Sequence, residues 1–210
     1  MDSSVSKGSA RAGLALGAAL LSAALCATAS AAAPEVAGGG TGTAAVAPAR
    51  ACPIVYFDLG ETLVHTAADG TTGYQPGAAA YLRALRERRV PVGLITNVPS
   101  SWGATDAERA ARLRQEVDAT WRGSTPFPWE DFGARVLTPR TEAERKPGPT
   151  LWQRAKAGSG RCLVVHQAET AEEVRAASAV GFVPYQVGRP HRPAFLPVRL
   201  VELLDRRSPA

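Results

Sequence analysis

The sequence contains no stretch in which basic residues alternate with aromatic ones, although its formal net charge is +5. Such stretches are typical of nucleic-acid-binding surfaces, so their absence argues against a nucleic-acid partner. The excess of arginine is better interpreted as a solvated surface. No internal repeat is visible, and the length of 210 residues suits one domain with a full hydrophobic core.

Long uncharged runs are also absent, except near the start of the chain. Lys7 and Arg11 precede an apolar, alanine-rich run over residues 12–33 that contains small-residue cleavage sites. This pattern is typical of a secretory signal peptide, so we expect residues 1–31 to be removed and the protein to be exported to the periplasm or outside of a bacterial cell. An uncleaved membrane anchor is the alternative, and no stable membrane span is expected if the signal is cleaved. Residues 32–51 form an Ala/Gly/Pro-rich linker that we expect to be disordered.

Cysteine is scarce, with three residues in the chain. Removal of the signal leaves Cys52 and Cys162. Export makes a disulfide between them chemically reasonable, and two buried free thiols are the alternative that the residues alone leave open.

From Cys52 onward, short apolar runs alternate with helical patterns. This alternation predicts an α/β fold, a three-layer Rossmann-like parallel sheet of about five strands with helices on both faces. Pro184 predicts that the last strand lies at an edge. The expected strands are residues 53–57, 90–96, 134–138, 162–166 and 182–187, and the expected helices are residues 76–89, 105–117, 149–157, 170–180 and 196–207.

Polar residues follow these strands at the edge where parallel sheets bind ligands. Asp58 follows the first strand, Thr96 and Asn97 follow the second, and Lys146 opens the helix after the third. A carboxylate can attack phosphorus while hydroxyl and ammonium groups hold the phosphate oxygens. The set therefore indicates phosphoryl transfer.

Four segments resemble, in order, the motifs of the haloacid dehalogenase (HAD) superfamily. They are FDLGETL, GLITN, RKPGPTLWQRA and CLVVHQAETAEEVRAASAVGF. The resemblance implies an HAD-like domain over residues 52–207 and an Mg²⁺-dependent phosphatase. Asp58 would be the nucleophile and a metal ligand, and the backbone carbonyl of Gly60 a second ligand. Thr96 and Lys146 would bind phosphate, with Asn97 beside the substrate.

Two departures from the family pattern weaken this implication. Gly60 stands where the family has its general acid, and Glu61 is the nearest replacement, unless it is only a solvated loop residue. His166 and Gln167 stand where a glycine and a metal-binding aspartate are expected, which leaves Glu172 and Glu173 as candidates, with Glu172 the tentative ligand. Glu173 is interpreted as part of a capping box with Thr170. A catalytically impaired HAD-fold protein that binds a ligand or partner is therefore the alternative function.

The resemblance also has consequences for the substrate and the cysteines. Neither the segment 64–75 nor the segment 98–133 accommodates a separate cap domain, so we expect an open site that admits a phosphorylated small molecule or a macromolecular substrate. Dehalogenation is disfavoured because no cap supplies a halide pocket. In the HAD arrangement the fourth strand lies beside the first, which would place Cys52 and Cys162 within disulfide reach.

Overall fold

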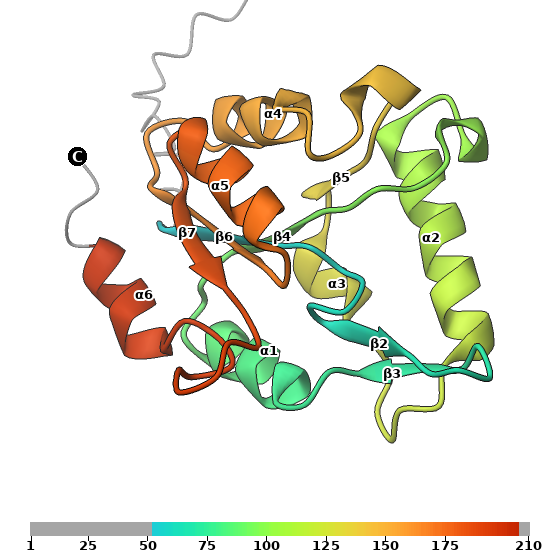
Figure 1. The fold of residues 1–210 in the computed structure, drawn as a ribbon, viewed down its shortest axis with the longest axis horizontal. Helices are drawn as coiled ribbons and strands as arrows, with labels where there is room; N and C mark the ends of the chain where they lie inside the picture. The colour runs from blue at the N-terminus through green and yellow to red at the C-terminus, as the bar shows by residue number, and fades with distance from the viewer. Residues whose placement is uncertain (1–51, 206–210) are drawn as a thin grey trace, which may run out of the picture. The chain divides into compact units, whose positions relative to one another are not determined.

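The computed structural model describes residues 52–205, so the predicted signal peptide (1–31) and linker (32–51) lie outside the described residues. The described chain is built on a five-stranded sheet in the order β5-β4-β1-β6-β7 (Figure 1). All four neighbouring strand pairs are parallel. The predicted three-layer α/β fold is thus confirmed, as is the position of the last strand at an edge. The strands are β1 (Ile54–Phe57), β4 (Val92–Ile95), β5 (Val136–Leu137), β6 (Val164–Ala168) and β7 (Val183–Gln186).

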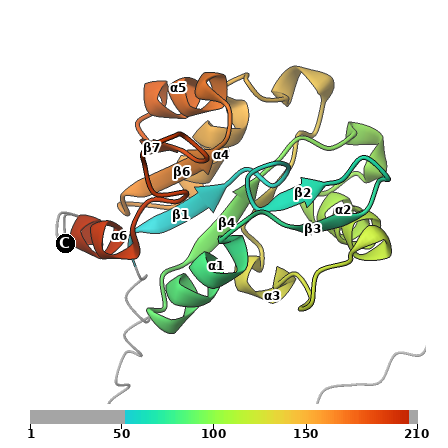
Figure 2. The same cartoon turned by 60° about the horizontal axis from the view of Figure 1, so that its bottom comes forward.

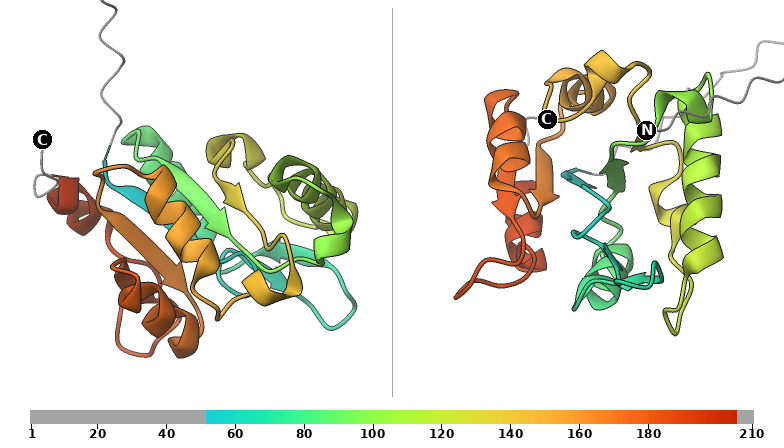
Figure 3. Two further views of the ribbon diagram at one scale, coloured as in Figure 1. Left: turned by 90° about the horizontal axis from the view of Figure 1, so that it is seen from above. Right: turned by 45° about the vertical axis from the view of Figure 1, so that its right-hand side comes forward.

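Helices cover both faces of this sheet. Figure 2 shows α4 and α5 on one side of β1, β4 and β6, and α1 and α3 on the other. In both views of Figure 3, α2 and α6 lie on opposite sides of the described domain. The helices are α1 (Ala78–Glu87), α2 (Asp106–Thr120), α3 (Trp129–Phe132), α4 (Thr150–Gly158), α5 (Ala171–Ala179) and α6 (Val198–Asp205), with short 3-10 turns at Ser100–Trp102 and Glu142–Glu144.

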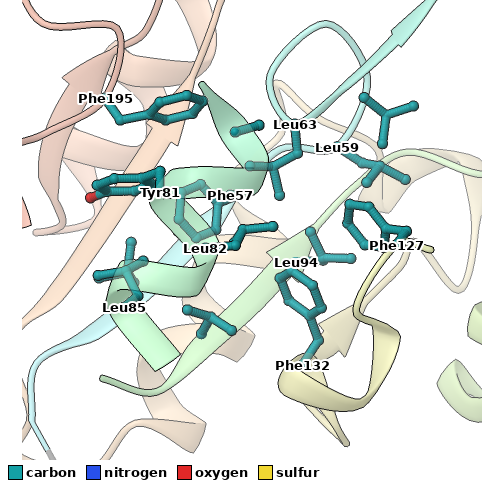
Figure 4. Close-up of a cluster of buried hydrophobic side chains, with 14 of the residues drawn as sticks. Phe57, Leu59, Leu63, Tyr81, Leu82, Leu85, Leu94, Phe127, Phe132 and Phe195 are labelled. Atoms are coloured by element: carbon teal, nitrogen blue, oxygen red, sulfur yellow. The ribbon is translucent and has the colours of Figure 1, made fainter. Parts of the chain in front are cut away.

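The alternation of side chains along β1 explains why the molecule has two cores. Val55 and Phe57 belong to the larger cluster, which α1, α2, α3 and α6 complete, and Figure 4 shows Phe57 near Tyr81 and Leu82 of α1. Ile54 and Tyr56 point the other way, into the cluster formed with α4 and α5. Because successive residues of a strand face opposite sides, the four-residue run IVYF is apolar throughout and fully buried.

The segment 64–75, expected as a flap-like loop, contains a short antiparallel hairpin. It consists of β2 (Val64–Thr66) and β3 (Thr72–Tyr74). The Thr72 hydroxyl donates to the carbonyl of Val117 at 3.2 Å, so the hairpin packs against the C-terminal end of α2. The segment 98–133 packs on the same sheet through α2 and α3, and neither segment forms a separate layer. Phe127 and Trp129 are buried there, and Trp102 and Trp121 pack partly buried against the same core.

A disulfide joins Cys52, just before β1, to Cys162, just before β6, with 5.2 Å between their Cα atoms. The bridge predicted from the HAD-like strand order is therefore confirmed. The two strands are neighbours, with Ile54 opposite Val164, so both cysteines lie at the amino end of the sheet. The candidate site lies at the other end.

Candidate functional site

The candidate site lies where the topology of the sheet changes direction. From β1 the chain passes to β4 and β5 on one side, whereas β6 and β7 lie on the other side of β1. In open α/β sheets, ligands bind at such a point beyond the carboxyl ends of the strands. Asp58 follows β1 at this point, and its backbone N–H donates to the carbonyl of Gln167 in β6 at 3.0 Å.

Lys146 is bound to two carboxylates in the interior of this site. Its Nζ lies 2.5 Å from Oδ1 of Asp58 and 2.8 Å from Oε2 of Glu173. The side chain of Lys146 is only 2% exposed and that of Asp58 only 10% exposed. A buried ammonium group is tolerated when it is paired and hydrogen-bonded, so these two acids fix the position of the lysine.

Asn97 holds the backbone of Lys146. Its Nδ2 donates to the Lys146 carbonyl at 3.0 Å, and its Oδ1 accepts from the Lys146 N–H at 2.9 Å. The sequence predicted that Asn97 lies beside the substrate. The structure instead shows its amide engaged in joining the end of β4 to the loop before α4, which makes Asn97 a residue that positions Lys146.

Thr96 ends the buried run of β4 and is 6% exposed. Its backbone N–H donates to the Leu137 carbonyl at 3.1 Å, which ties it to β5. Within residues 52–205 its hydroxyl group makes none of the observed hydrogen bonds, so this hydroxyl can accept or donate to a ligand. The predicted phosphate-binding residues Thr96 and Lys146 thus both lie at the carboxyl edge of the sheet.

Glu173 contributes to the site in a way that the sequence did not predict. The Thr170 hydroxyl caps α5 by accepting from the Glu173 N–H at 3.3 Å, as the capping motif predicts. The Glu173 carboxylate, however, binds Lys146 rather than the N-cap backbone. Burial opposes its ionisation, but its neighbours, among them the Lys146 ammonium that donates to it, outweigh burial, so the pKa of Glu173 is lowered.

Glu169 is an acid of the site that the sequence analysis did not identify. Its Oε2 accepts from the Thr62 hydroxyl at 2.7 Å, and the same hydroxyl lies 3.4 Å from Oδ2 of Asp58. The Glu169 backbone N–H in turn donates to the Thr62 oxygen at 3.1 Å. Partial burial, followed by the negative charges of Asp58 and Glu173, raises the pKa of Glu169. Negative charge is therefore concentrated at this edge.

The expectation that the fourth strand ends at His166 is wrong, because β6 continues to Ala168. Gln167 consequently faces the α1 side, where its Nε2 donates to the Tyr81 hydroxyl at 2.9 Å and its Oε1 accepts from the Leu196 N–H at 2.9 Å. It is a buried structural residue and does not occupy the position of a metal ligand.

Glu172, the tentative metal ligand, has an exposed side chain on the first turn of α5. The helix directs the adjacent Glu173 toward Lys146 instead. Neighbouring residues of a helix point about 100° apart, so only one of the two glutamates can face the site. The structure therefore replaces Glu172 by Glu169 and Glu173 as the acids near Asp58.

His166 lies fully buried on the other face of the strand, among Trp152, Phe182 and Tyr56. Neither ring nitrogen has a hydrogen-bond partner within the described chain, and Nε2 is 3.9 Å from Glu173, beyond hydrogen-bonding distance. Burial lowers the pKa of His166, so the ring is neutral at pH 7.

Glu61 fastens the hairpin that borders the site. Its carboxylate lies 2.8 Å from His65 Nδ1 and accepts from the Gln75 amide at 2.8 Å and from the Thr66 N–H at 3.0 Å. The hydrogen bonds from His65 and Thr66 lower its pKa. Glu61 also adopts a φ of 51°, in the left-handed region that non-glycine residues seldom occupy. An ionised, structurally engaged carboxylate of this kind has no proton to supply as a general acid.

Gly60 is exposed, and its carbonyl makes none of the observed hydrogen bonds in the described chain. A Cβ atom added at Gly60 would meet nothing within 4 Å.

Residues 52–205 contain no cluster of three or more His, Cys, Asp or Glu side chains with the arrangement of a metal site.

Comparison with known proteins supports the fold. The structure is similar to the crystal structure of an uncharacterized protein from Listeria monocytogenes serotype 4b, with a TM-score of 0.50 and 14% sequence identity, over 74% of this chain and 99% of that chain. No family model and no curated protein matches the sequence. At this level of identity the similarity extends to the α/β architecture alone.

Proposed function

We propose that the protein is an HAD-like phosphohydrolase that cleaves phosphate monoesters through an aspartyl-phosphate on Asp58. The observation that supports this proposal best is the buried contact of 2.5 Å between Lys146 Nζ and Asp58 Oδ1 at the switch point of the sheet. This contact brings together the residue that follows β1 and a residue of the loop before α4. An ammonium group beside a carboxylate is suited to hold a phosphate oxygen while the carboxylate attacks phosphorus.

The donor atoms of the site suit a magnesium ion. Asp58 and Glu169 approach the same Thr62 hydroxyl with one carboxylate oxygen each, and carboxylate oxygens are the ligands that Mg²⁺ prefers. Burial, followed by the charges of Asp58 and Glu173, raises the pKa of Glu169, and a bound cation would favour its ionised form. We therefore assign Asp58, Glu169 and the Gly60 carbonyl as the residues that would hold Mg²⁺. When bound, the ion supplies charge neutralisation at the phosphoryl oxygens.

The two oxygens of Asp58 have different environments. Oδ1 is held by Lys146, whereas Oδ2 has the Thr62 hydroxyl at 3.4 Å as its neighbour. One carboxylate oxygen of Asp58 attacks phosphorus, a P–O bond to Asp58 forms, and the ester P–O bond breaks so that the alcohol oxygen leaves with the electron pair and takes a proton from water. Water then attacks phosphorus, which releases inorganic phosphate and restores Asp58.

Lys146 and Thr96 orient the phosphoryl group during both steps. An ammonium group has three N–H donors, and Asp58 and Glu173 occupy two of them. The third donor remains for a phosphate oxygen. The Thr96 hydroxyl, which has no partner among the described residues, serves a second phosphate oxygen.

A binding protein without turnover is the second candidate, and Gly60 is the observation that favours it. Neither Gly60 nor the engaged Glu61 can protonate a leaving oxygen, and general acid catalysis typically contributes about 10²–10⁴-fold to rate. In this alternative, the same cluster binds a phosphorylated ligand and releases it unchanged.

Export is part of the proposal. Disulfides persist in oxidising compartments, and the Cys52–Cys162 bridge agrees with a periplasmic or extracellular location. No helix within residues 52–205 combines the length and the apolar composition that crossing a membrane requires.

Hydrolysis of p-nitrophenyl phosphate, with Mg²⁺ and with EDTA, tests the proposal. The wild-type protein should show Mg²⁺-dependent turnover that Asp58→Asn reduces at least a thousandfold. Glu172→Gln is the matched control, because this glutamate is exposed on the helix that carries Glu173. Phosphate binding without any turnover above the Asp58→Asn variant would establish the binding protein instead.

A further inference from the structure

A hollow of about 380 Å³ lies on the α1 side of the domain, and its lining contains no residue of the Asp58 site. It is bounded by α1, by the segment that leads into α3 and by Tyr74 at the end of β3. Figure 2 shows α1 and α3 side by side, and the ion pair between Arg86 and Asp131, at 2.9 Å, joins them. Sites for small molecules typically measure about 300–1,000 Å³, so the hollow is large enough to hold one.

The inner wall of the hollow is apolar and fixed by ring packing. Phe127 and Leu82 are buried members of the larger hydrophobic cluster, and Figure 4 shows both. Tyr74 stacks on Phe127 with 5.9 Å between the ring centroids, and its hydroxyl donates to the Pro126 carbonyl at 2.8 Å. Phe127 stacks in turn on Phe132 at 5.5 Å. This wall is therefore formed before a ligand arrives, and it suits the hydrocarbon part of one.

The outer part of the hollow is lined by three arginines that come from two helices. Arg83 and Arg86 lie three residues apart on α1, and Arg114 lies on α2. Glu130 is the one acid among the lining residues that the structure describes, so positive charge is in excess in the lining. Arg83 is exposed and has no hydrogen-bond or ion-pair partner within residues 52–205. Like charges at this spacing on a helix repel one another, and an anion in the hollow would relieve that repulsion.

The two paired arginines keep most of their donors for a ligand. Arg86 binds Asp131 through Nε, and the Nε of Arg114 lies 3.3 Å from Asp118. The terminal nitrogens of both guanidinium groups make none of the hydrogen bonds observed in the described chain. Two parallel N–H groups of a guanidinium group match the two oxygens of a carboxylate. The hollow thus combines an apolar wall with donors that suit a carboxylate.

We propose that this hollow is a binding site for a small amphiphilic anion, a carboxylate carried on a hydrocarbon body of one or two rings. The rings pack against Tyr74 and Phe127, and the carboxylate meets the three arginines. An apolar cavity of about 150 Å³ accommodates benzene, so a hollow of about 380 Å³ has room for two fused rings and a carboxylate. Glu130 disfavours a second negative charge, which favours a monoanion over a phosphate ester. The site does not depend on the proposed phosphohydrolase function, because no residue that this function uses lines it.

Calorimetric titration with three probes tests the class of ligand. 2-Naphthoate carries both rings and charge, 2-naphthylmethanol has the rings without the charge, and acetate has the charge without the rings. We expect 2-naphthoate to bind the wild-type protein at least about tenfold more tightly than either of the others. Equal binding of 2-naphthoate and 2-naphthylmethanol, or a Kd for 2-naphthoate above about 1 mM, would overturn the proposal.

Substitution of the arginines locates the site. Arg83→Gln and Arg114→Gln should each weaken the binding of 2-naphthoate at least about fivefold, because a hydrogen bond between charged groups is lost. Arg112→Gln is the matched control. Arg112 is exposed on the same helix as Arg114 and is likewise paired with an acid four residues on, Glu116, but it does not line the hollow. Equal losses in all three variants would reveal a general effect of charge and refute the site.

Filling the hollow provides an independent test. Ala79→Trp should abolish the binding of 2-naphthoate, since Ala79 belongs to the lining. Ala80→Trp is the control, because Ala80 is the next residue of α1, is exposed and does not line the hollow. Unchanged affinity in an Ala79→Trp variant that melts like the wild-type protein would contradict the assignment. If Ala79→Trp does not fold, the arginine variants decide.

An acidic peptide is the alternative occupant of a hollow lined by arginines. Hexaglutamate carries carboxylates without rings, so we expect it to bind more weakly than 2-naphthoate. Tighter binding of hexaglutamate, with the same losses in Arg83→Gln and Arg114→Gln, would overturn the small-molecule assignment in favour of an acidic partner.

Discussion

Removal of the Cys52–Cys162 disulfide should destabilise the domain by an amount that the chain length between the cysteines determines. The bridge closes a loop with a sequence separation of 110 residues. Cross-linking a loop of about 100 residues lowers the entropy of the unfolded chain by the equivalent of about 4.7 kcal/mol. Loss of this constraint corresponds to a melting temperature lower by roughly 10–19 °C for a domain of this size.

Urea unfolding of the wild-type protein and of three variants measures this loss. Each single variant, Cys52→Ala and Cys162→Ala, should lose the full amount, and the double variant should lose little more, because the bridge is already absent in either single variant. Reduction of the wild-type protein with dithiothreitol should give the same midpoint as the double variant. Additive losses, or a total loss below about 1 kcal/mol, would refute the loop-closure reasoning.

Three further predictions concern the candidate site. Glu169→Gln should lower the apparent affinity for Mg²⁺, measured from the shift that Mg²⁺ causes in thermal melting, by at least about tenfold. Glu172→Gln should leave this affinity unchanged, and the opposite order would reject the ligand assignment. Gly60→Asp has room for its side chain and should raise the rate of hydrolysis of alkyl phosphates at least about tenfold by supplying a general acid. The rate on p-nitrophenyl phosphate should change little, and equal gains on both esters would contradict the general-acid role. Burial lowers the pKa of His166 in the folded state, so the unfolded state binds more protons than the folded state below pH 6.5. The free energy of unfolding should therefore fall as the pH drops through this value, by up to about 1.4 kcal/mol per pH unit. His166→Leu should remove this part of the slope, and an unchanged slope in denaturant titrations at pH 5 to 7 would show that the group responsible lies elsewhere.

Most of the fold could be predicted from the sequence, because the strands of a parallel sheet covered on both faces are continuously apolar. All five strands of the main sheet and the five longer helices occur where they were expected, within a few residues. The β2–β3 hairpin was missed because its strands have only three residues each. Asp69-Gly70 was the available signal, since this dipeptide favours hairpin turns, and Gly70 indeed has a φ of 81°.

The acids of the site were harder to predict, because an error of two residues at a strand end changes which residue lies beyond that end. Placing the end of β6 at His166 made Gln167 the residue expected beside Asp58, whereas the strand continues to Ala168. The N-cap at Thr170 could have fixed the boundary, since Glu169 is the one residue between the strand and this cap. Asp58, Thr96 and Lys146 were easier, because each adjoins an unambiguous apolar run or helix start.

The charges of the site explain why a cation belongs in the proposed mechanism. Asp58 and Glu173 bind one ammonium group, Glu169 lies near Asp58 through the shared Thr62 hydroxyl, and His166 is neutral because it is buried. Lys146 can therefore offset only one of the three carboxylates, and carboxylates held together in a partly buried site disfavour one another's ionisation. Burial, followed by the charges of Asp58 and Glu173, raises the pKa of Glu169. A divalent cation between Asp58 and Glu169 would balance the remaining charge, and the phosphate dianion of a substrate would then meet a site that attracts it rather than one that repels it.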